Sequence, residues 1–311
     1  MKIVVTGALG HIGSRLIREL PFSLPGCEII MVDNMMTQRY CSLFNLPVEG
    51  RYRFVEADIT KTDLSALLAG AAVVVHLAAI TDAAGSFDRA EQLEENNFNA
   101  TRRLSEACAD AGVRLIAFSS TSVYGTQAEL VAEDCSEEEL NPQSPYATTK
   151  LKEERFVQQL VEERGLRAAI FRFGTIFGMS PGMRFHTAVN KFCWQAAMGQ
   201  PITVWSTAYD QKRPYLDLGD ACEAVAHIIR SELFDGRIYN VLTLNATVRE
   251  VIDVIRLFVP TLAVQFVDNR SMNQLSYEVI DARFRSTGYM PAARLADTLR
   301  LELMLLLPGL N

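Results

Sequence analysis

Short runs of β-branched and aliphatic residues alternate with longer helical patterns through the first half of the chain. These runs are almost continuously apolar, which is typical of strands buried on both faces of a parallel sheet. They are Lys2–Thr6, Glu28–Asp33, Tyr52–Ala57, Val73–His76, Val113–Ser119 and Arg167–Phe173. The helical patterns between them are Ile12–Leu20, Asp63–Leu68, Ala90–Asp110 and Tyr146–Arg164. The alternation predicts a doubly wound α/β fold, in which ligands bind beyond the carboxyl ends of the strands.

The regular alternation ends near Gly174, and a loop containing Pro and Gly is expected at Met179–Arg184. Less regular elements follow. They are helices at Phe185–Met198, Asp217–Arg230 and Val248–Phe258, and strands at Pro201–Trp205 and Ile238–Val241. We therefore expect residues 1–175 to form a Rossmann domain that the chain re-enters around 213–240, and residues 176–311 to form mainly a smaller α/β substrate-binding lobe.

The composition of the 311 residues, 49% hydrophobic and 22% charged, is that of a globular protein. A net charge of −7 argues against nucleic acid or an anionic membrane as the main partner, because phosphate binding needs a concentrated basic surface. No apolar run is long enough to span a bilayer. The 6 cysteines have no C-x-x-C or metal-ligand spacing. We expect most of them to be buried thiols in a reducing compartment, with no metal site, and a cytoplasmic location for the protein.

A glycine-rich turn follows the first predicted strand directly. Gly7, Gly10 and Gly13 lie between that strand and the first predicted helix. The turn lets a pyrophosphate approach the backbone, and the helix N-terminus presents free N–H groups to it. Asp33 ends the second strand, where a carboxylate accepts hydrogen bonds from ribose hydroxyls and repels a 2′-phosphate. The sequence therefore predicts a site for NAD rather than NADP.

Other residues at the ends of the strands are candidates for the same cofactor. Asp58 and Ile59 suit the amino group and the face of an adenine, although Asp58 is equally explained as a turn residue. Asn96 is a candidate for holding the adjacent loop, with a surface role as the alternative. The remaining cofactor candidates are His11, Ile12, Asn34, Leu77, Ala78, Ala79, Ser119 and Phe173.

Tyr146 and Lys150 lie four residues apart in a predicted helix that opens with Ser144 as N-cap and Pro145 as first residue. The two side chains then share one helix face, and a neighbouring ammonium lowers the cost of forming a phenolate. Tyr146 is thus a candidate general base. A hydroxyl cluster at the end of the fifth strand supplies a partner that orients the reacting oxygen, with Ser120 preferred and Thr121 as the alternative.

Together these residues resemble the extended short-chain dehydrogenase/reductase family, in its NAD-dependent nucleotide-sugar epimerase/dehydratase branch. The similarity rests on the glycine loop, on Tyr146 with Lys150, and on further motifs along the chain. These are Val32-Asp33-Asn34, His76-Leu77-Ala78-Ala79, Ser119-Ser120, Val123-Tyr124-Gly125, Arg172-Phe173-Gly174 and Arg213-Pro214-Tyr215-Leu216-Asp217-Leu218-Gly219-Asp220. The resemblance implies that Lys150 and Tyr146 also contact NAD, and that the substrate is a sugar carried on a nucleoside diphosphate.

The same resemblance suggests residues for the substrate. Arg213 and Arg270 are expected to grip the diphosphate or the nucleoside, because guanidinium groups match phosphate oxygens in two-pronged contacts. The other substrate candidates are Thr81, Ser122, Arg184 and Asn190. Members of the family often form homodimers by packing two long helices, here near Ala90–Asp110 and Tyr146–Arg164. Leu93, Leu104 and Phe156 are candidates for that surface or for the contact with the sheet.

The residues after Ser120 help to choose a reaction. Hexose 4,6-dehydratases of this branch carry an Asp-Glu pair where this chain has Thr121 and Ser122. Hydroxyl groups are poor acids and bases at neutral pH, so a usual dehydratase is disfavoured. We predict an epimerase acting at C4 through a transient keto intermediate. The alternatives are a dehydratase or decarboxylase, a net NAD-dependent oxidoreductase and, least favoured, an NAD-binding sensor without catalysis.

Overall fold

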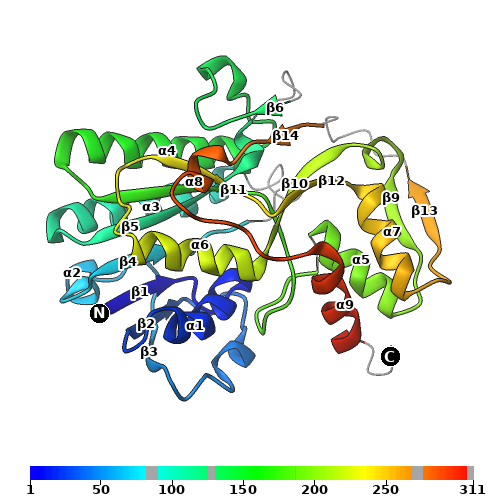
Figure 1. Cartoon of the computed structure of the whole chain (residues 1–311). Coiled ribbons are helices and arrows are strands. Elements are labelled where there is room, and N and C mark those ends of the chain that lie inside the picture. The colour runs from blue at the N-terminus through cyan, green and yellow to red at the C-terminus, as the bar shows by residue number, and fades with distance from the viewer. Residues whose placement is uncertain (82–89, 125–129, 186, 268–275, 307–311) are drawn as a thin grey trace.

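A computed structural model describes residues 1–81, 90–124, 130–185, 187–267 and 276–306 of the protein. A seven-stranded sheet forms its centre, in the order β11-β7-β5-β4-β1-β2-β3 (Figure 1). Every neighbouring pair in this sheet is parallel. Its strands are β1 (Lys2–Thr6), β2 (Glu28–Asp33), β3 (Arg51–Glu56), β4 (Val73–His76), β5 (Arg114–Ser120), β7 (Ala168–Phe173) and β11 (Ile238–Val241). The predicted doubly wound α/β fold is confirmed.

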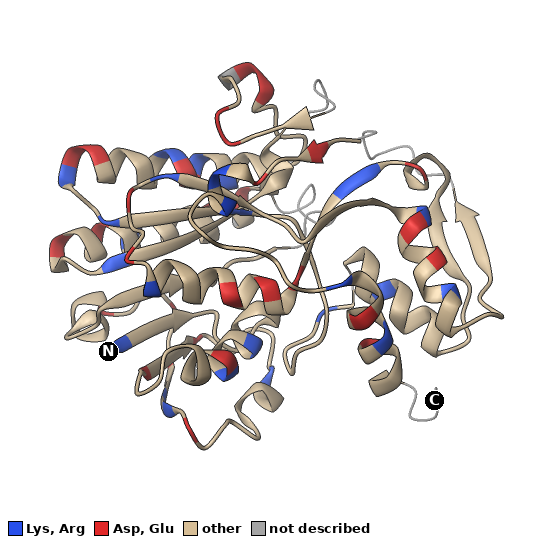
Figure 2. Cartoon of the chain, in the orientation of Figure 1, with Lys and Arg blue, Asp and Glu red and all other residues tan. Residues whose placement is uncertain are grey.

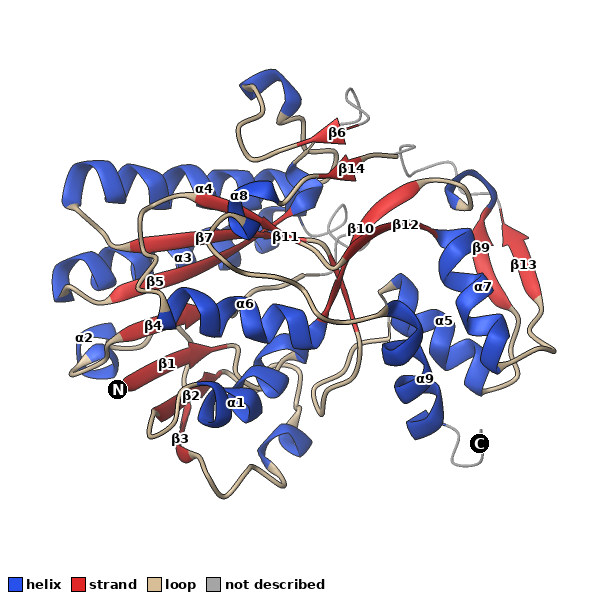
Figure 3. Ribbon diagram, viewed as in Figure 1, coloured by secondary structure: helices blue, strands red, loops and turns tan. Residues whose placement is uncertain are grey.

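Helices cover both faces of this sheet (Figure 3). One face packs against α1 (His11–Ser23) and α6 (Leu218–Arg230), and the other against α2 (Leu64–Leu68), α3 (Ala90–Ala111) and α4 (Pro145–Arg164). The strands are buried on both sides and therefore read as continuous apolar runs. The last strand, β11, and the helix α6 come from late in the chain yet complete this layer, so the chain returns to the large sheet.

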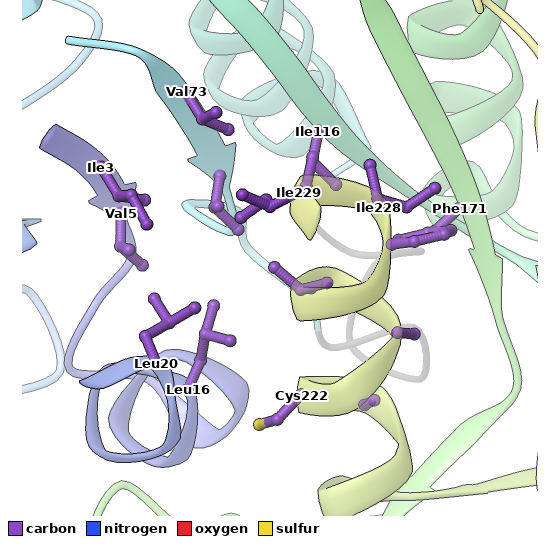
Figure 4. Packing of buried hydrophobic residues seen from close by; sticks show 14 of the residues in the cluster. Ile3, Val5, Leu16, Leu20, Val73, Ile116, Phe171, Cys222, Ile228 and Ile229 are labelled. Atoms are coloured by element: carbon purple, nitrogen blue, oxygen red, sulfur yellow. The ribbon is translucent and has the colours of Figure 1, made fainter. Parts of the chain in front are cut away.

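Figure 4 shows how the first face is packed, with α1 and α6 set against the strands. Leu16 and Leu20 of α1 are fully buried, as are Ile228 of α6 and Val5 of β1. Burying one Leu or Ile side chain contributes roughly 1.5–3 kcal/mol. This apolar contact fixes the N-terminus of α1 at the carboxyl edge of the sheet, where a dinucleotide phosphate binds in doubly wound folds.

The second half of the chain adds a smaller lobe with its own apolar core. It contains a three-stranded sheet in the order β12-β10-β8, a pair β13-β9 and the helices around them. The strands are β8 (Thr175–Phe177), β9 (Ile202–Trp205), β10 (Lys212–Asp217), β12 (Leu244–Thr247) and β13 (Val264–Val267). The helices are α5 (Ala188–Ala197), α7 (Val248–Phe258) and α9 (Leu295–Leu306).

Small elements connect the two parts. The pair β6 (Leu130–Val131) and β14 (Glu278–Val279) joins segments far apart in sequence, and α8 (Ala282–Arg285) packs beside β11. Short 3-10 helices lie at Tyr40–Leu43, Thr121–Val123, Glu137–Glu139 and Ser206–Ala208. Figure 2 shows basic and acidic residues interspersed along the outer helices. Among the described residues, no helix is long and apolar enough to cross a membrane.

Candidate active site

The glycine loop follows β1 and is shaped by contacts of the backbone with itself. Gly7 has φ +66°, and a Cβ placed there would lie 2.7 Å from the backbone nitrogen of Ala78. A Cβ at Gly13 would lie 2.3 Å from the Gly7 carbonyl oxygen. Gly10 is less crowded, with the Gly7 oxygen 3.2 Å from its hypothetical Cβ. Gly7 therefore lets the loop pack against the backbone that follows β4, and Gly13 lets the loop close on itself, while Gly10, which lines the pocket, is less crowded.

Asp33 stands at the carboxyl end of β2, beside this loop. Its Oδ2 accepts a hydrogen bond from the Leu9 backbone nitrogen at 3.1 Å, and its Oδ1 accepts one from the Met35 nitrogen at 3.0 Å. Two backbone donors thus fix the carboxylate, and each oxygen keeps a lone pair for a ribose hydroxyl. Arg39, which the sequence reasoning did not select, also lines the pocket here. Burial lowers the pKa of Arg39, and the charge of Asp33 opposes that shift.

A single pocket runs from the glycine loop to Tyr146 and encloses about 490 Å³, within the range of small-molecule sites. Every residue predicted for the cofactor lines it. They are Gly7, Gly10, His11, Ile12, Gly13, Asp33, Asn34, Asp58, Ile59, Leu77, Ala78, Ala79, Asn96, Ser119, Tyr146, Lys150 and Phe173. The narrow glycine turn, the fixed carboxylate of Asp33 and this continuous cavity fit an NAD molecule.

One of these residues, and the neighbour of another, also hold the loops around the pocket. Asp58 Oδ1 accepts hydrogen bonds from the Thr60 nitrogen and hydroxyl at 2.9 and 2.7 Å, so it forms the turn after β3 while also lining the pocket. The Thr60 hydroxyl is the main cause that lowers the pKa of Asp58. The loop after β4 is held by Asn97, whose amide exchanges two 2.8 Å hydrogen bonds with the backbone of Ile80. Sequence reasoning considered Asn96 for that task and missed its neighbour.

Tyr146 and Lys150 lie near the start of α4. The Ser144 side chain caps this helix by accepting from the Ala147 nitrogen, and Pro145 is its first residue, both as predicted. The Lys150 nitrogen lies 6.0 Å from the centre of the Tyr146 ring, and both residues line the pocket. One turn further, the Lys150 Nζ forms a 2.8 Å ion pair with Glu153 Oε2.

Burial and the neighbouring charges have opposing effects on the pKa values of Tyr146 and Lys150. Burial raises the pKa of Tyr146, and the charge of Glu153 adds to that shift, whereas Lys150 and Arg184 oppose it. Burial lowers the pKa of Lys150, but Glu153 and Tyr146 outweigh burial and the net shift is upward. Lys150 therefore remains a cation, and its expected stabilisation of the Tyr146 phenolate has the right sign. In the protein alone, that stabilisation is smaller than the cost of burying the phenolate.

The hydroxyl side chains at the carboxyl end of β5 have different environments. Ser120 lines the pocket, and its Oγ accepts from the Ser122 nitrogen at 3.2 Å and from the Ser122 hydroxyl at 2.9 Å. Thr121 is buried and donates to the Phe173 carbonyl oxygen at 3.3 Å. Neither Thr121 nor Ser122 is among the residues that line the pocket. The geometry favours Ser120 over Thr121 as the hydroxyl that meets a substrate.

The residues predicted for the substrate lie in different places. Arg184 donates a hydrogen bond to the Thr81 hydroxyl, and both line the pocket near Tyr146. Asn190 is fully buried, accepts from the Gly178 nitrogen at 3.1 Å and donates to the Arg184 carbonyl at 3.1 Å, so it supports the loop rather than lining the pocket. Arg213 lies on β10, 5.8 Å from the centre of the Tyr277 ring, outside the pocket lining. Arg270 lies outside the described residues.

Across the part of the chain that the structure describes, no three His, Cys, Asp or Glu side chains are grouped so as to hold a metal ion. The profile of the NAD dependent epimerase/dehydratase family matches residues 3–241. The chain belongs to this family. It is accordingly an NAD-dependent enzyme with an extended short-chain dehydrogenase/reductase fold, which confirms the predicted family, enzyme class and cofactor.

Similar proteins include epimerases and dehydratases. The uncharacterized UDP-glucose epimerase YtcB of Bacillus subtilis (strain 168) is 31% identical over 249 residues, 78% of this chain and 76% of the relative. The trifunctional UDP-glucose 4,6-dehydratase/3,5-epimerase/reductase RHM2 of Arabidopsis thaliana is 31% identical over 96% of this chain, which spans only 46% of that relative. The crystal structure of a UDP-glucuronic acid 4-epimerase from Bacillus cereus, bound to UDP-glucuronic acid and NAD, matches with a TM-score of 0.90 and 26% identity. That match covers 98% of this chain and 99% of the other.

Proposed function

We propose that the protein is an NAD-dependent epimerase of a nucleoside-diphosphate sugar that inverts the configuration at C4. The observation that carries this proposal is the placement of Tyr146, Lys150 and Ser120 in one pocket with the glycine loop. The similarity to a UDP-glucuronic acid 4-epimerase over nearly the whole chain supports the same reaction. NAD, when bound, supplies a group that reversibly accepts a hydride.

Three side chains of the protein, Tyr146, Ser120 and Lys150, handle the proton of the substrate hydroxyl. The Tyr146 phenolate accepts the proton of the substrate hydroxyl as the C4 hydroxyl group is oxidised to a ketone. It returns the proton when the hydroxyl group re-forms. Ser120 hydrogen-bonds the same oxygen and keeps it facing Tyr146. Lys150, held in the cationic form beside Glu153, stabilises the phenolate. Lys150 is buried and Tyr146 is partly buried, so the protein shields this pair from much of the surrounding water.

The hydroxyl side chains that follow Ser120 favour epimerisation over elimination of water. Thr121 and Ser122 carry no carboxylate, and their hydroxyl groups bind the Phe173 carbonyl and Ser120 respectively. Neither is a general acid or base at neutral pH. A dehydratase remains the second candidate because the plant relative carries that activity in its name.

We also propose that residues 176–311 form mainly the substrate-binding lobe. In this proposal Arg184 approaches the sugar or its diphosphate from the pocket wall, paired with Thr81. Arg213 and Arg270 bind the diphosphate or the nucleoside in this proposal. Ser122 acts through Ser120, and Asn190 acts by holding the loop that carries Arg184.

A homodimer in the cytoplasm, packed through α3 and α4, completes the proposal. Phe156 is available for such a surface, since it is partly buried and stacks edge-on with Phe98 at 5.7 Å. Leu93 and Leu104 are fully buried inside the protomer and so belong to its own core.

The decisive experiment is to incubate the purified protein with UDP-, GDP-, CDP- and dTDP-sugars and to analyse the products by mass spectrometry and proton NMR. We expect a product of unchanged mass with inverted C4. Loss of water or of carbon dioxide would instead identify a dehydratase or decarboxylase. A sustained rise in NADH absorbance during turnover would identify a net oxidoreductase.

A further inference from the structure

Two neighbouring carboxylates of α4 are buried, and they have different partners. Glu154 is committed to the sheet, because both of its oxygens bind Arg172 of β7. Glu153 binds within the helix instead, where its Oε2 lies 2.8 Å from the Nζ of Lys150, a residue that lines the pocket. The Lys150 and Glu153 side chains are 7% and 6% exposed. This pair is therefore shielded from solvent. By contrast, Lys152 of the same helix forms an ion pair with Glu94 in which both side chains are about half exposed.

We propose that Glu153 is the positioning residue for Lys150, holding its ammonium beside Tyr146 and keeping it protonated in a buried site. This proposal rests on the proposed roles of Tyr146 and Lys150 in catalysis. It adds a fourth member to the group, one that acts through Lys150 and does not itself line the pocket.

The physical need for such a residue follows from burial. A buried amine loses its proton readily, since a low-dielectric environment disfavours the charged form. An uncharged Lys150 could not stabilise a phenolate at Tyr146. A carboxylate at 2.8 Å provides the compensating charge and fixes the position of the flexible lysine side chain. The second oxygen, Glu153 Oε1, is buried with no hydrogen-bond partner among the described residues. Lys150 is thus the partner that accounts for the placement of this carboxylate.

The other charged groups around this pair come from several elements. Arg184, on the loop after β8, acts on Tyr146. Glu154 acts on Lys150 from the same helix but is paired with Arg172. His76 of β4 is close enough to sense the charge of Lys150, and it stays neutral because it is buried. Glu153 is thus the carboxylate in direct contact with the ammonium, and its charge raises the pKa of both Tyr146 and Lys150.

This arrangement has a signature that an ion pair with a purely structural role would lack. Neutralising Glu153 should lower both pKa values together. In the Glu153→Gln variant we expect both limbs of the pH profile of kcat/KM to move to lower pH. We also expect kcat at the optimum to fall about tenfold, because the lysine is less firmly placed. In Glu153→Asp the charge is kept and the reach is shorter, so kcat should fall while both limbs stay near their wild-type pH.

A second readout does not depend on turnover. The tyrosinate absorbance of NAD-loaded protein is titrated with pH, and the contribution of Tyr146 is obtained by subtracting the Tyr146→Phe titration, in the wild-type and Glu153→Gln backgrounds. Tyr146 should ionise at lower pH when residue 153 is Gln. This measurement remains informative even if the sugar substrate proves different from the one proposed.

The matched control is Glu94→Gln, which breaks the exposed pair with Lys152 on the same helix and should leave both limbs in place. The proposal is overturned if Glu153→Gln keeps the wild-type pH profile and the wild-type Tyr146 titration, whatever its melting temperature. It is also overturned if Glu153→Asp shifts the limbs as far as Glu153→Gln does.

Discussion

The guanidinium of Arg172 on β7 binds the carboxylate of Glu154 on α4 in a two-pronged contact, with Nε 3.0 Å from Oε1 and Nη2 2.6 Å from Oε2. Both side chains are 2% exposed. Glu154 lies one helical turn beyond Lys150, so the pair fastens α4 to the central sheet. The placement of Tyr146, which lies on the same helix, therefore depends on a contact between that helix and the sheet.

Breaking this pair should destabilise the whole protein. Glu154→Gln leaves the Arg172 charge buried without its counter-ion, and we expect a loss of about 3–5 kcal/mol in the free energy of unfolding. Urea denaturation at neutral pH measures the change. Glu94→Gln removes an exposed pair and should cost no more than about 1 kcal/mol. Equal losses in the two variants would contradict the structural role assigned to Glu154.

Removing the phenol should abolish turnover without unfolding the protein. Tyr146→Phe deletes the oxygen that takes the substrate proton and keeps the ring, so we expect kcat to fall roughly 10²–10⁴-fold. Bound NAD and the circular dichroism spectrum should be unchanged. Tyr209→Phe, in the smaller lobe, is the control and should retain activity. Substantial activity in Tyr146→Phe would exclude this residue as the general base.

Asp33 should decide the affinity for the dinucleotide. In Asp33→Asn one anionic oxygen is lost, so the Leu9 or the Met35 backbone contact weakens along with the bond to the ribose. We expect NAD to bind about 10- to 100-fold more weakly, with less discrimination against NADP. Calorimetric titration of cofactor-depleted protein measures both affinities. Glu56→Gln, at the exposed end of the adjacent strand, should bind as the wild type does. Unchanged NAD affinity in Asp33→Asn would remove Asp33 from the site.

His76 should make the fold sensitive to mild acid. Burial lowers the pKa of His76 from 6.5 to about 3, with Lys150 contributing, and its ring contacts the hydroxyls of Thr6 and Thr101. The unfolded chain takes up a proton at this residue below pH 6.5 and the folded chain does so only near pH 3. Stability should therefore fall with decreasing pH in this window by about 1.4 kcal/mol per pH unit. Denaturation curves of His76→Gln should lack this component, whereas His227→Gln should alter the slope less.

Glu302 on α9 should have the opposite effect. Burial raises the pKa of this carboxyl from 4.5 to about 8, and the nearby charge of Asp217 adds to the shift. The folded protein holds a proton that the unfolded chain releases above pH 4.5, so stability should decline as pH rises towards 8. Glu302→Gln, which cannot ionise, should be more stable than the wild type at pH 8 and nearly equal at pH 5. The same pH dependence in both proteins would show that Glu302 ionises freely in the folded state.

Much of the fold was readable from the sequence because the large sheet is buried on both faces. Its strands appear as nearly unbroken apolar runs, and the predicted bounds of β5 and β7 are within one residue of those observed. Strands such as β8 and β12 were not predicted. They have three and four residues and are partly polar, so their pairing across the lobe, rather than their own pattern, makes them strands.

The sequence by itself determined the dinucleotide fold, its cofactor and the spacing of Tyr146 and Lys150. Each of these depends on residues that are close together in the chain, within one strand, turn or helix. Only the tertiary structure decided which hydroxyl faces the pocket, that Asn97 holds the β4 loop, and that Arg172 takes Glu154 while Lys150 takes Glu153. The reason is physical. A local pattern fixes which face of an element a side chain occupies, but not which of two neighbouring carboxylates meets a given cation. Arg172 comes from β7 and takes Glu154, which leaves Glu153 of the same helix to Lys150, and that division depends on how α4 packs against the sheet.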